Sequence, residues 1–233
     1  TNIDNSDALL LVAKTAPSGK EAVKSGSLSL FLIDLPNESL DYTPIPKHGF
    51  NYYKSNQLFI EDLFVPESAL VGTLGKGFAS LAPTLNAERL LVAAGSIGLA
   101  RLALSSAVLY ASERVVFDVP IGAHQAVQHP LAAAHARLES AWWTVRQAAA
   151  MEDQGDQSAH ATALANTAKY VAVEAAIDAC YHSLQAHGGA GYAREYHQER
   201  WWREVQLFRL APLTQQMTLN FIGQHVLGLP RSY

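Results

Sequence analysis

Hydrophobic and polar positions change their pattern once along the chain. Up to residue 72, short apolar runs are separated by Pro, Gly, Asn and Ser, which is typical of strands joined by turns. The runs predict strands at 8–13, 28–34 and 57–64, with a polar hairpin loop at 16–27. We therefore expect a β-rich region over residues 1–72.

From residue 73 onward the pattern is helical, because Ala and Leu recur at the spacing of one helix face. The spacing predicts long helices at 76–114, 124–153, 158–187 and 212–227, and a shorter one at 197–206. Short connections indicate that consecutive helices pack antiparallel. The predicted fold class is α+β: part of a β-barrel-like or β-sandwich-like domain over 1–72, followed by an antiparallel four-helix bundle over 73–233.

Composition narrows the class of protein. The 233 residues carry a net charge of −4 at pH 7, which argues against broad binding to nucleic acids or anionic membranes. The one cysteine, Cys180, allows no internal disulfide, which suits the cytoplasm. The most apolar window, 90–111, contains Arg101, which would cost roughly 2.5–3.5 kcal/mol in a bilayer. We expect a bundle helix there and no membrane span.

Several familiar catalytic and metal-binding patterns are absent from the sequence. Nothing matches a nucleophile elbow, a P-loop or an HExxH zinc motif. Cys180 and His182 are two positions apart, so on a helix they point to different faces. His124, His129 and His135 lack the spacing of a shared metal site, and we expect no metal.

A glycine cluster closes the third long helical run. Gly188, Gly189 and Gly191 follow Gln185, and they are more glycines than a helix stop requires. They would let another backbone or a flat, polyanionic ligand approach closely, with the Gln185 amide as donor and acceptor. The alternative is a plain helix C-cap.

A carboxylate interrupts an apolar stripe of the first long helix. Glu88 shares the helical spacing of Leu81, Leu85, Val92, Gly95, Leu99 and Leu102. Desolvation on such a stripe would make the carboxylate a stronger base, as proton abstraction requires. The alternative is a buried Glu paired with an Arg of a neighbouring helix.

A second charged position lies at the end of this helix. Arg114 precedes a connector that holds Phe117 and Gly122, and Gln125 opens the next helix. An Arg beside helix-start N–H groups is a suitable phosphate site. Alternatively, Arg114 only complements the dipole at the helix C-terminus.

Taken in order, these segments resemble the C-terminal three-fifths of the acyl-CoA dehydrogenase family. A missing initiator Met before Thr1 also leads us to expect a C-terminal piece of a longer protein. The segments that carry the resemblance are Thr1-Asn2 with the following strand, Leu58-Phe-Ile-Glu-Asp-Leu-Phe-Val-Pro66, Gly75-Lys-Gly77-Phe78, Leu85-Asn-Ala-Glu-Arg89, Tyr110 to Gln125, and Gln185 to Arg203.

The resemblance implies a flavoenzyme of fatty acid metabolism. Family members bind FAD and an acyl-CoA thioester; a carboxylate takes the α-proton while the β-hydrogen leaves as hydride to the flavin. The product is a trans-2-enoyl-CoA, and electrons pass to a carrier, usually electron-transfer flavoprotein. It also implies a homodimer or homotetramer, or a hetero-oligomer.

Individual site residues follow from the matched positions. Thr1 matches a Thr beside the flavin ring, and Thr214 and Gln216 match a Thr-x-Gln that touches the flavin dinucleotide. Asn86 and Arg89 match substrate-side positions. The positions that match contacts to the FAD of a neighbouring subunit are Arg114, Phe117, Gln125, Gln185, Gly188 and Gly189.

Two departures from the family pattern affect the expected chemistry. The commonest base is a Glu where this chain has Pro212, which cannot accept a proton. A minority of members place the base in a Glu-Arg pair on the first bundle helix, which Glu88 and Arg89 match. Asp118 also replaces a usual Gly after Phe117. An active dehydrogenase with Glu88 as base is the first interpretation; a non-catalytic subunit of a heteromeric relative and a flavin-free helical interaction module are the alternatives.

Overall fold

Contacts within the chain divide it into two compact units, Thr1–Thr84 and Leu85–Tyr233. A computed structural model describes residues 1–15 and 28–231, so the expected hairpin loop at 16–27 lies outside the described residues. The division falls inside helix α1 (Gly77–Glu113). It does not by itself locate a domain boundary, and the boundary expected between residues 72 and 73 stays a prediction.

The first unit is built on short antiparallel strands. Strand β2 (Leu28–Asp34) lies between β1 (Ala8–Lys14) and β5 (Leu70–Val71), and β3 (Leu40–Pro44) pairs with β4 (Asn56–Ile60). Short 3₁₀ turns lie at Ile3–Asn5 and Glu67–Ala69. Among the described residues the sheets form no closed barrel, as expected for part of a β-domain. The pattern missed β3 and β5, and the predicted strand at 57–64 ends at Ile60.

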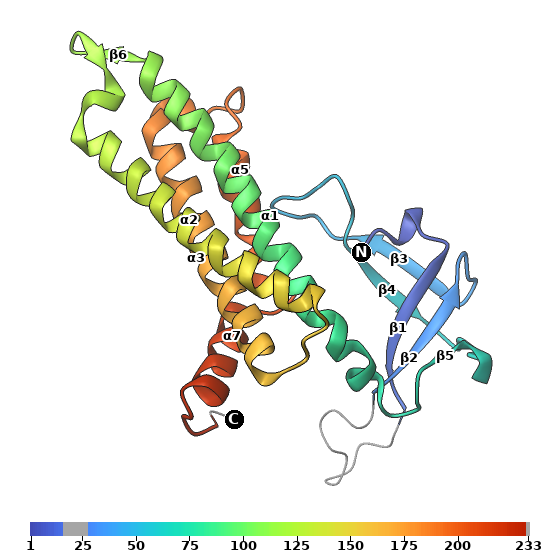
Figure 1. Cartoon of the computed structure of the whole chain (residues 1–233). Coiled ribbons are helices and arrows are strands. Elements are labelled where there is room, and N and C mark those ends of the chain that lie inside the picture. The colour runs from blue at the N-terminus through green and yellow to red at the C-terminus, as the bar shows by residue number, and fades with distance from the viewer. Residues whose placement is uncertain (16–27, 232–233) are drawn as a thin grey trace. The chain divides into compact units, whose positions relative to one another are not determined.

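The second unit is a helical bundle, as predicted (Figure 1). The ends of α1, α2 (Gln125–Asp153) and α3 (Ala159–His187) agree with the predicted ends to within one residue. The fourth long helix differs from its prediction at 212–227. It begins later, as α7 (Gln215–Phe221), and continues as a π-helical turn at Ile222–Val226. The smaller elements are the hairpin β6 (Val115–Val116) and β7 (Val119–Pro120), a 3₁₀ turn at Ile121–Ala123, α4 (Gly189–Tyr192), α5 (Gln198–Val205) and α6 (Leu207–Leu210).

The bundle core is made largely of alanines, which let the helices approach closely. Fully buried alanines lie on all three long helices, among them Ala93, Ala134 and Ala168. Helix α3 starts where the Ser158 hydroxyl accepts a hydrogen bond from the amide of Ala161, and it ends at Gly188 with φ +57°.

The structure does not bury the face of α1 that the sequence predicted to be buried. The buried positions are Asn86, Leu90, Ala93, Ser96, Ile97, Ala100, Ala103, Leu104, Ala107 and Ala111. Glu88 is exposed and Leu102 is 53% exposed. Apolar residues occur all around this helix, so hydrophobic spacing alone could not select a face, and the side with small alanines is the one that packs closely.

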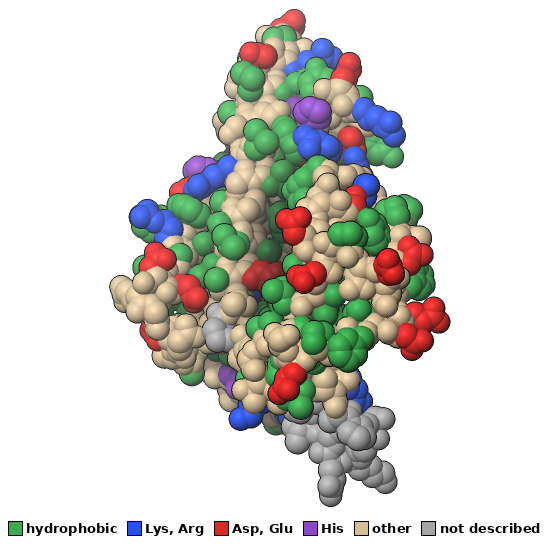
Figure 2. Space-filling model, turned by 90° about the vertical axis from the view of Figure 1, so that its right-hand side faces the viewer, with side chains coloured by type: hydrophobic (Ala, Val, Ile, Leu, Met, Phe, Trp, Pro, Cys, Tyr) green, Lys and Arg blue, Asp and Glu red, His purple; other side chains and the backbone are tan. Residues whose placement is uncertain are grey.

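Among the described residues, one helical stretch, Thr84–Glu113 of α1, is long and apolar enough to span a membrane by length and composition. In the bundle, however, its buried alanines share one core with α2 and α3. Arg101 donates a hydrogen bond to Glu139 of α2 at 2.7 Å and lies over the ring of Trp142. Figure 2 shows acidic, basic and hydrophobic side chains mixed on the face that it draws, with no dominant basic patch there.

Candidate functional site

Four of the predicted site residues line one pocket in the bundle. Arg114, Gln185, Gly188 and Gly189 surround a hollow of about 510 Å³. Arg114 follows the C-terminus of α1, whereas the other three come from the end of α3 and the start of α4. The chain therefore brings together, from positions more than 70 residues apart in sequence, a guanidinium, an amide and exposed glycine backbone. These groups can bind a phosphate-bearing ligand, and the pocket is also lined by the carboxylate of Glu195.

The three glycines of the cluster have different structural reasons. Gly188 needs its positive φ to end α3, and a Cβ on Gly191 would lie 2.6 Å from the Leu184 carbonyl oxygen. Gly189 has neither constraint, since φ is not positive and a Cβ there would meet no atom within 4 Å. A plain C-cap explains Gly188 and close packing explains Gly191. The open space at Gly189 is what a ligand would use, so these residues fit the pyrophosphate of a dinucleotide such as FAD.

An aromatic cluster that the sequence did not reveal supports this pocket. The Tyr110 ring stacks on the His187 imidazole with centroids 4.3 Å apart, and Tyr196 meets the same imidazole edge-on at 5.6 Å. His187 is buried, and its Nδ1–H donates to the Ser183 carbonyl oxygen at 2.8 Å. Burial lowers the pKa of His187, which favours the neutral imidazole. Periodicity did not indicate this cluster because its members lie on three separate segments.

Phe117 and Gln125 lie next to the pocket in sequence but do not line it. Phe117 and Asp118 form the tip of the β6–β7 hairpin with φ +53° and +64°, which is the geometry of a type I′ turn. An Asp tolerates this conformation better than a Phe does. The Phe117 side chain is 87% exposed, and Gln125 is exposed at the first turn of α2. Both are available to a second molecule.

The predicted substrate-side residues form a separate polar cluster near the start of α1. Asn86 is buried; its Nδ2 donates to the Thr162 hydroxyl at 3.3 Å and its Oδ1 accepts from Arg89 Nη1 at 2.9 Å. Burial lowers the pKa of Arg89, while the neighbouring charge of Glu88 acts to raise it. Arg89 Nε is buried without a hydrogen-bond partner within the described ranges. The cluster thus presents a fixed, incompletely satisfied cation beside the Glu88 carboxylate.

A buried lysine, which sequence reasoning missed, contacts the start of α7 and lies within electrostatic reach of Arg89. Lys169 is fully buried, and its Nζ donates to the Leu213 carbonyl oxygen at 2.9 Å and to Gln215 Oε1 at 3.2 Å. Thr214 is the N-cap of α7 and accepts from the amide of Met217, and Gln216 is exposed. The only signal in the sequence was a lysine within an Ala-rich helix.

The two candidate regions lie far apart in one chain. Arg114 directly follows the end of α1 and is 26 positions after Glu88, which corresponds to roughly 39 Å along the helix axis. The structure therefore does not bring Glu88, Asn86 and Arg89 together with the pocket at Arg114. Thr1 is exposed in the other unit, where the amide of Asn2 donates to the Lys54 carbonyl oxygen.

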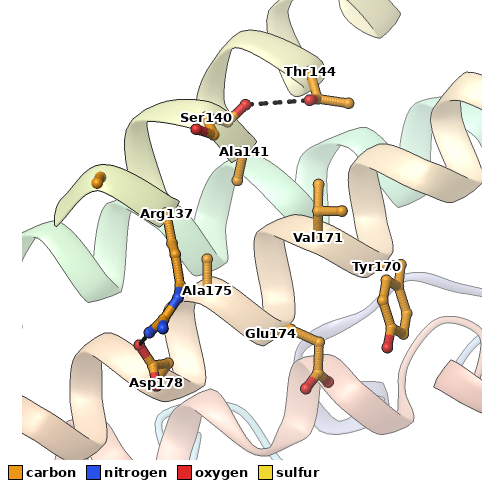
Figure 3. Close-up of a pocket in the computed structure, with 10 residues that line it drawn as sticks. Arg137, Ser140, Ala141, Thr144, Tyr170, Val171, Glu174, Ala175 and Asp178 are labelled. Atoms are coloured by element: carbon orange, nitrogen blue, oxygen red, sulfur yellow. Dashed lines mark hydrogen bonds and ion pairs between the residues drawn. The ribbon is translucent and has the colours of Figure 1, made fainter. Parts of the chain in front are cut away.

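A larger hollow of about 700 Å³ lies between α2 and α3 and holds none of the predicted residues. Figure 3 shows Arg137 of α2 reaching to Asp178 of α3, so this charge pair is already satisfied. Among the described residues, no group of three His, Cys, Asp or Glu side chains could hold a metal ion. We therefore place the chemistry at the two regions above rather than in the hollow between α2 and α3.

Comparison with known proteins gives a consistent result. The family "Acyl-CoA dehydrogenase, C-terminal domain" matches residues 75–227. Acyl-CoA dehydrogenase FadE12 of Mycobacterium tuberculosis is 39% identical over the whole chain, which covers 59% of that relative. The caffeyl-CoA reductase-Etf complex subunit CarC of Acetobacterium woodii is 35% identical over 82% of the chain and 50% of the relative.

The similarity extends to solved structures. The FAD complex of PigA superimposes with a TM-score of 0.88 at 26% identity, covering 98% of this chain and 58% of that one. The chain thus spans between one half and three fifths of the length of these relatives. The expected fold class is confirmed, whereas the individual site residues stay predictions.

Proposed function

Because the chain belongs to the acyl-CoA dehydrogenase family, we propose that the complete gene product is an FAD-dependent dehydrogenase of acyl-CoA thioesters. It would convert an acyl-CoA to a trans-2-enoyl-CoA and pass the electrons to an electron-transfer flavoprotein. FAD, when bound, would accept the β-hydrogen as a hydride. Membership of the family indicates a flavoprotein fold. The reaction and the electron acceptor are what we propose.

One observation carries the cofactor assignment. Arg114, Gln185 and Gly188 converge with Gly189 on one pocket, and Gly189 leaves space that neither backbone conformation nor packing explains. Arg114 would pair with a phosphate, and exposed backbone amides would bind the remaining oxygens. Phe117 and Gln125 would contact the same dinucleotide from the adjoining hairpin and helix.

The roughly 39 Å between Glu88 and Arg114 supports a shared site. Each flavin would lie with its dinucleotide in the pocket of one subunit and its ring near Glu88, Thr214 and Gln216 of another. We therefore propose a homodimer or homotetramer, or a hetero-oligomer. A cytoplasmic location is part of the same proposal.

Glu88 is the proposed base. Its side chain is exposed, so any exclusion of water from it must come from bound substrate and cofactor rather than from the bundle. Arg89, held by Asn86, would orient the thioester or the carboxylate. Pro212 instead favours a second candidate, a non-catalytic subunit, because it removes the commoner base.

The test is flavin content followed by reduction. The complete gene product is purified and its visible spectrum recorded, then acyl-CoA thioesters of different lengths are added anaerobically. We expect bound FAD that is bleached by at least one thioester. FAD that no thioester bleaches indicates the non-catalytic subunit, and a protein that retains no flavin indicates the flavin-free module.

A further inference from the structure

Lys169 is an unusual residue for the interior of a helical bundle. It lies in the middle of α3 and is fully buried, and within the described ranges it has no ion-pair partner. The charge of Glu174 acts on it favourably and that of Arg89 unfavourably. Burial lowers its pKa to about 8. A methionine would fill the same space without this desolvation cost, so core packing alone does not account for a lysine.

The Lys169 ammonium contacts the connector of residues 211–214, which joins α6 to α7. The connector has no regular secondary structure. The Thr214 carbonyl oxygen accepts from the Thr218 amide at 3.0 Å, in the first turn of α7, but the Leu213 carbonyl oxygen lies before that turn. Lys169 Nζ supplies a donor to the carbonyl of Leu213, in the middle of the connector. A buried carbonyl without a donor would favour other connector conformations.

The ends of the connector are tied to α3 as well. Arg209, just before it, donates from its guanidinium to both carboxylate oxygens of Glu174. Gln215, just after it, accepts from Lys169 through Oε1 and donates to Glu174 Oε1 through Nε2 at 2.9 Å. The connector is thus held at its start, middle and end by two residues of α3.

This arrangement sets the direction of the neighbouring side chains. Gln215 is buried and points to Lys169, whereas Gln216 beside it is exposed and Thr214 caps α7. We propose that Lys169 is a positioning residue of the flavin site, which orders the connector and thereby directs Thr214 and Gln216 toward FAD. The flavin part of this inference rests on the proposed function, whereas the ordering of the connector does not.

The proposed substrate side lies within electrostatic reach of Lys169. Asn86 binds Thr162 of α3, and the Asn166 amide on the next turn donates to the Thr162 carbonyl oxygen. The charge of Arg89 acts on Lys169. The described hydrogen bonds of Lys169 itself run to Leu213 and Gln215, so a change at Lys169 should affect the flavin contacts more than global folding.

A ligand-free experiment tests the first half of the proposal. In the complete gene product, Lys169→Met removes the two hydrogen bonds of the ammonium group while the side chain keeps nearly the same length. The amides of Met217 and Thr218 donate to the Thr214 side chain and carbonyl oxygen, so their exchange reports whether the end of the connector is ordered. We expect hydrogen exchange of these two amides to rise about tenfold or more in Lys169→Met, because a hydrogen bond from a charged group is lost. Val173→Ala, also fully buried on α3, is the matched control and should not raise exchange selectively there. Unchanged exchange at 217–218 in Lys169→Met overturns the proposal.

A flavin experiment tests the second half. Lys169→Met should weaken FAD binding about tenfold and change the visible circular dichroism of the bound flavin, whereas Val173→Ala should change neither. Equal FAD affinity and equal spectra in the two variants overturn the positioning role. A wild-type protein that binds no FAD contradicts the proposed function instead, and exchange of the amides at 217–218 then still decides whether Lys169 orders the connector.

A second variant covers the case in which Lys169→Met does not fold. Gln215→Met keeps the lysine and its bond to Leu213 but removes the amide that joins Lys169 to Glu174. We expect a smaller change in the same direction, with raised exchange of the amides at 217–218 and weaker FAD binding. Wild-type values for both quantities overturn the proposal.

Discussion

The Tyr110 ring on α1 stacks on the His187 imidazole at the end of α3, with their planes inclined by 19°. This contact joins the helix that leads to Arg114 with the residue that precedes Gly188. The two walls of the candidate dinucleotide pocket are therefore fixed to each other by a buried contact. Changes to the ligand-facing groups can be made without disturbing that support.

Arg114→Gln should weaken FAD binding by about tenfold or more, because a charge-assisted hydrogen bond to phosphate contributes ~1.5–3 kcal/mol. Arg114 is exposed, so thermal stability without FAD should stay nearly constant. Titration with FAD, followed by flavin fluorescence, measures the change. Arg137→Gln, at the hollow without predicted site residues, is the control and should bind FAD normally. Equal affinity of both variants would place the dinucleotide elsewhere.

Gly191→Ala and Gly189→Ala separate packing from ligand access. A Cβ at Gly191 would lie 2.6 Å from a carbonyl oxygen and 2.8 Å from His187 Cβ, so we expect a loss of about 1–3 kcal/mol in the free energy of unfolding. A Cβ at Gly189 meets nothing, so stability should change by less than about 0.5 kcal/mol while FAD affinity falls. Urea unfolding and FAD titration of both variants check this. Normal FAD binding by Gly189→Ala counts against the pocket.

Lys169 predicts a pH dependence of stability. Its pKa is about 8 in the folded chain and 10.5 in the unfolded one, so between these values the unfolded state binds more protons. The free energy of unfolding should therefore rise with pH in this window, by at most about 1.4 kcal/mol per pH unit. Lys169→Met should lack this contribution. Urea unfolding of both proteins at pH 7.5, 9 and 10 measures the difference; parallel curves would show that the lysine is not desolvated.

The helices of the bundle were predictable, whereas the buried face of α1 was not. Local signals such as Ser158 and Gly188 set the helix ends, and the chain follows them. Which face of α1 is buried depends on alanines that allow close approach, and hydrophobic spacing does not report this. The same limit misplaced Glu88, which was expected on a desolvated stripe and is exposed.

The residues of the candidate site were likewise predictable only in part. Arg114, Gln185, Gly188 and Gly189 were recognised from local motifs and do share a pocket. Lys169 was missed because its function depends on a carbonyl 44 residues later in the chain, and no local pattern encodes such a contact.

Assembly is a further prediction. If each flavin requires residues of two subunits, the complete gene product with FAD should be at least a dimer at micromolar concentration. Light scattering after size exclusion gives the mass directly. The exposed Phe117 offers a check, because Phe117→Ser should weaken FAD retention without altering the folded monomer. A monomer that retains FAD would contradict the shared site.

The anaerobic reduction of bound flavin by acyl-CoA tests the central claim most directly, when wild type is compared with Glu88→Gln. The substitution keeps size and shape but removes the proton acceptor, and the exposed position makes a folding defect unexpected. We predict that a thioester bleaches the wild-type flavin and that Glu88→Gln reacts at least roughly 10²–10⁴ times more slowly, with FAD content unchanged. Bleaching of Glu88→Gln at the wild-type rate would contradict the assignment of Glu88 as the base.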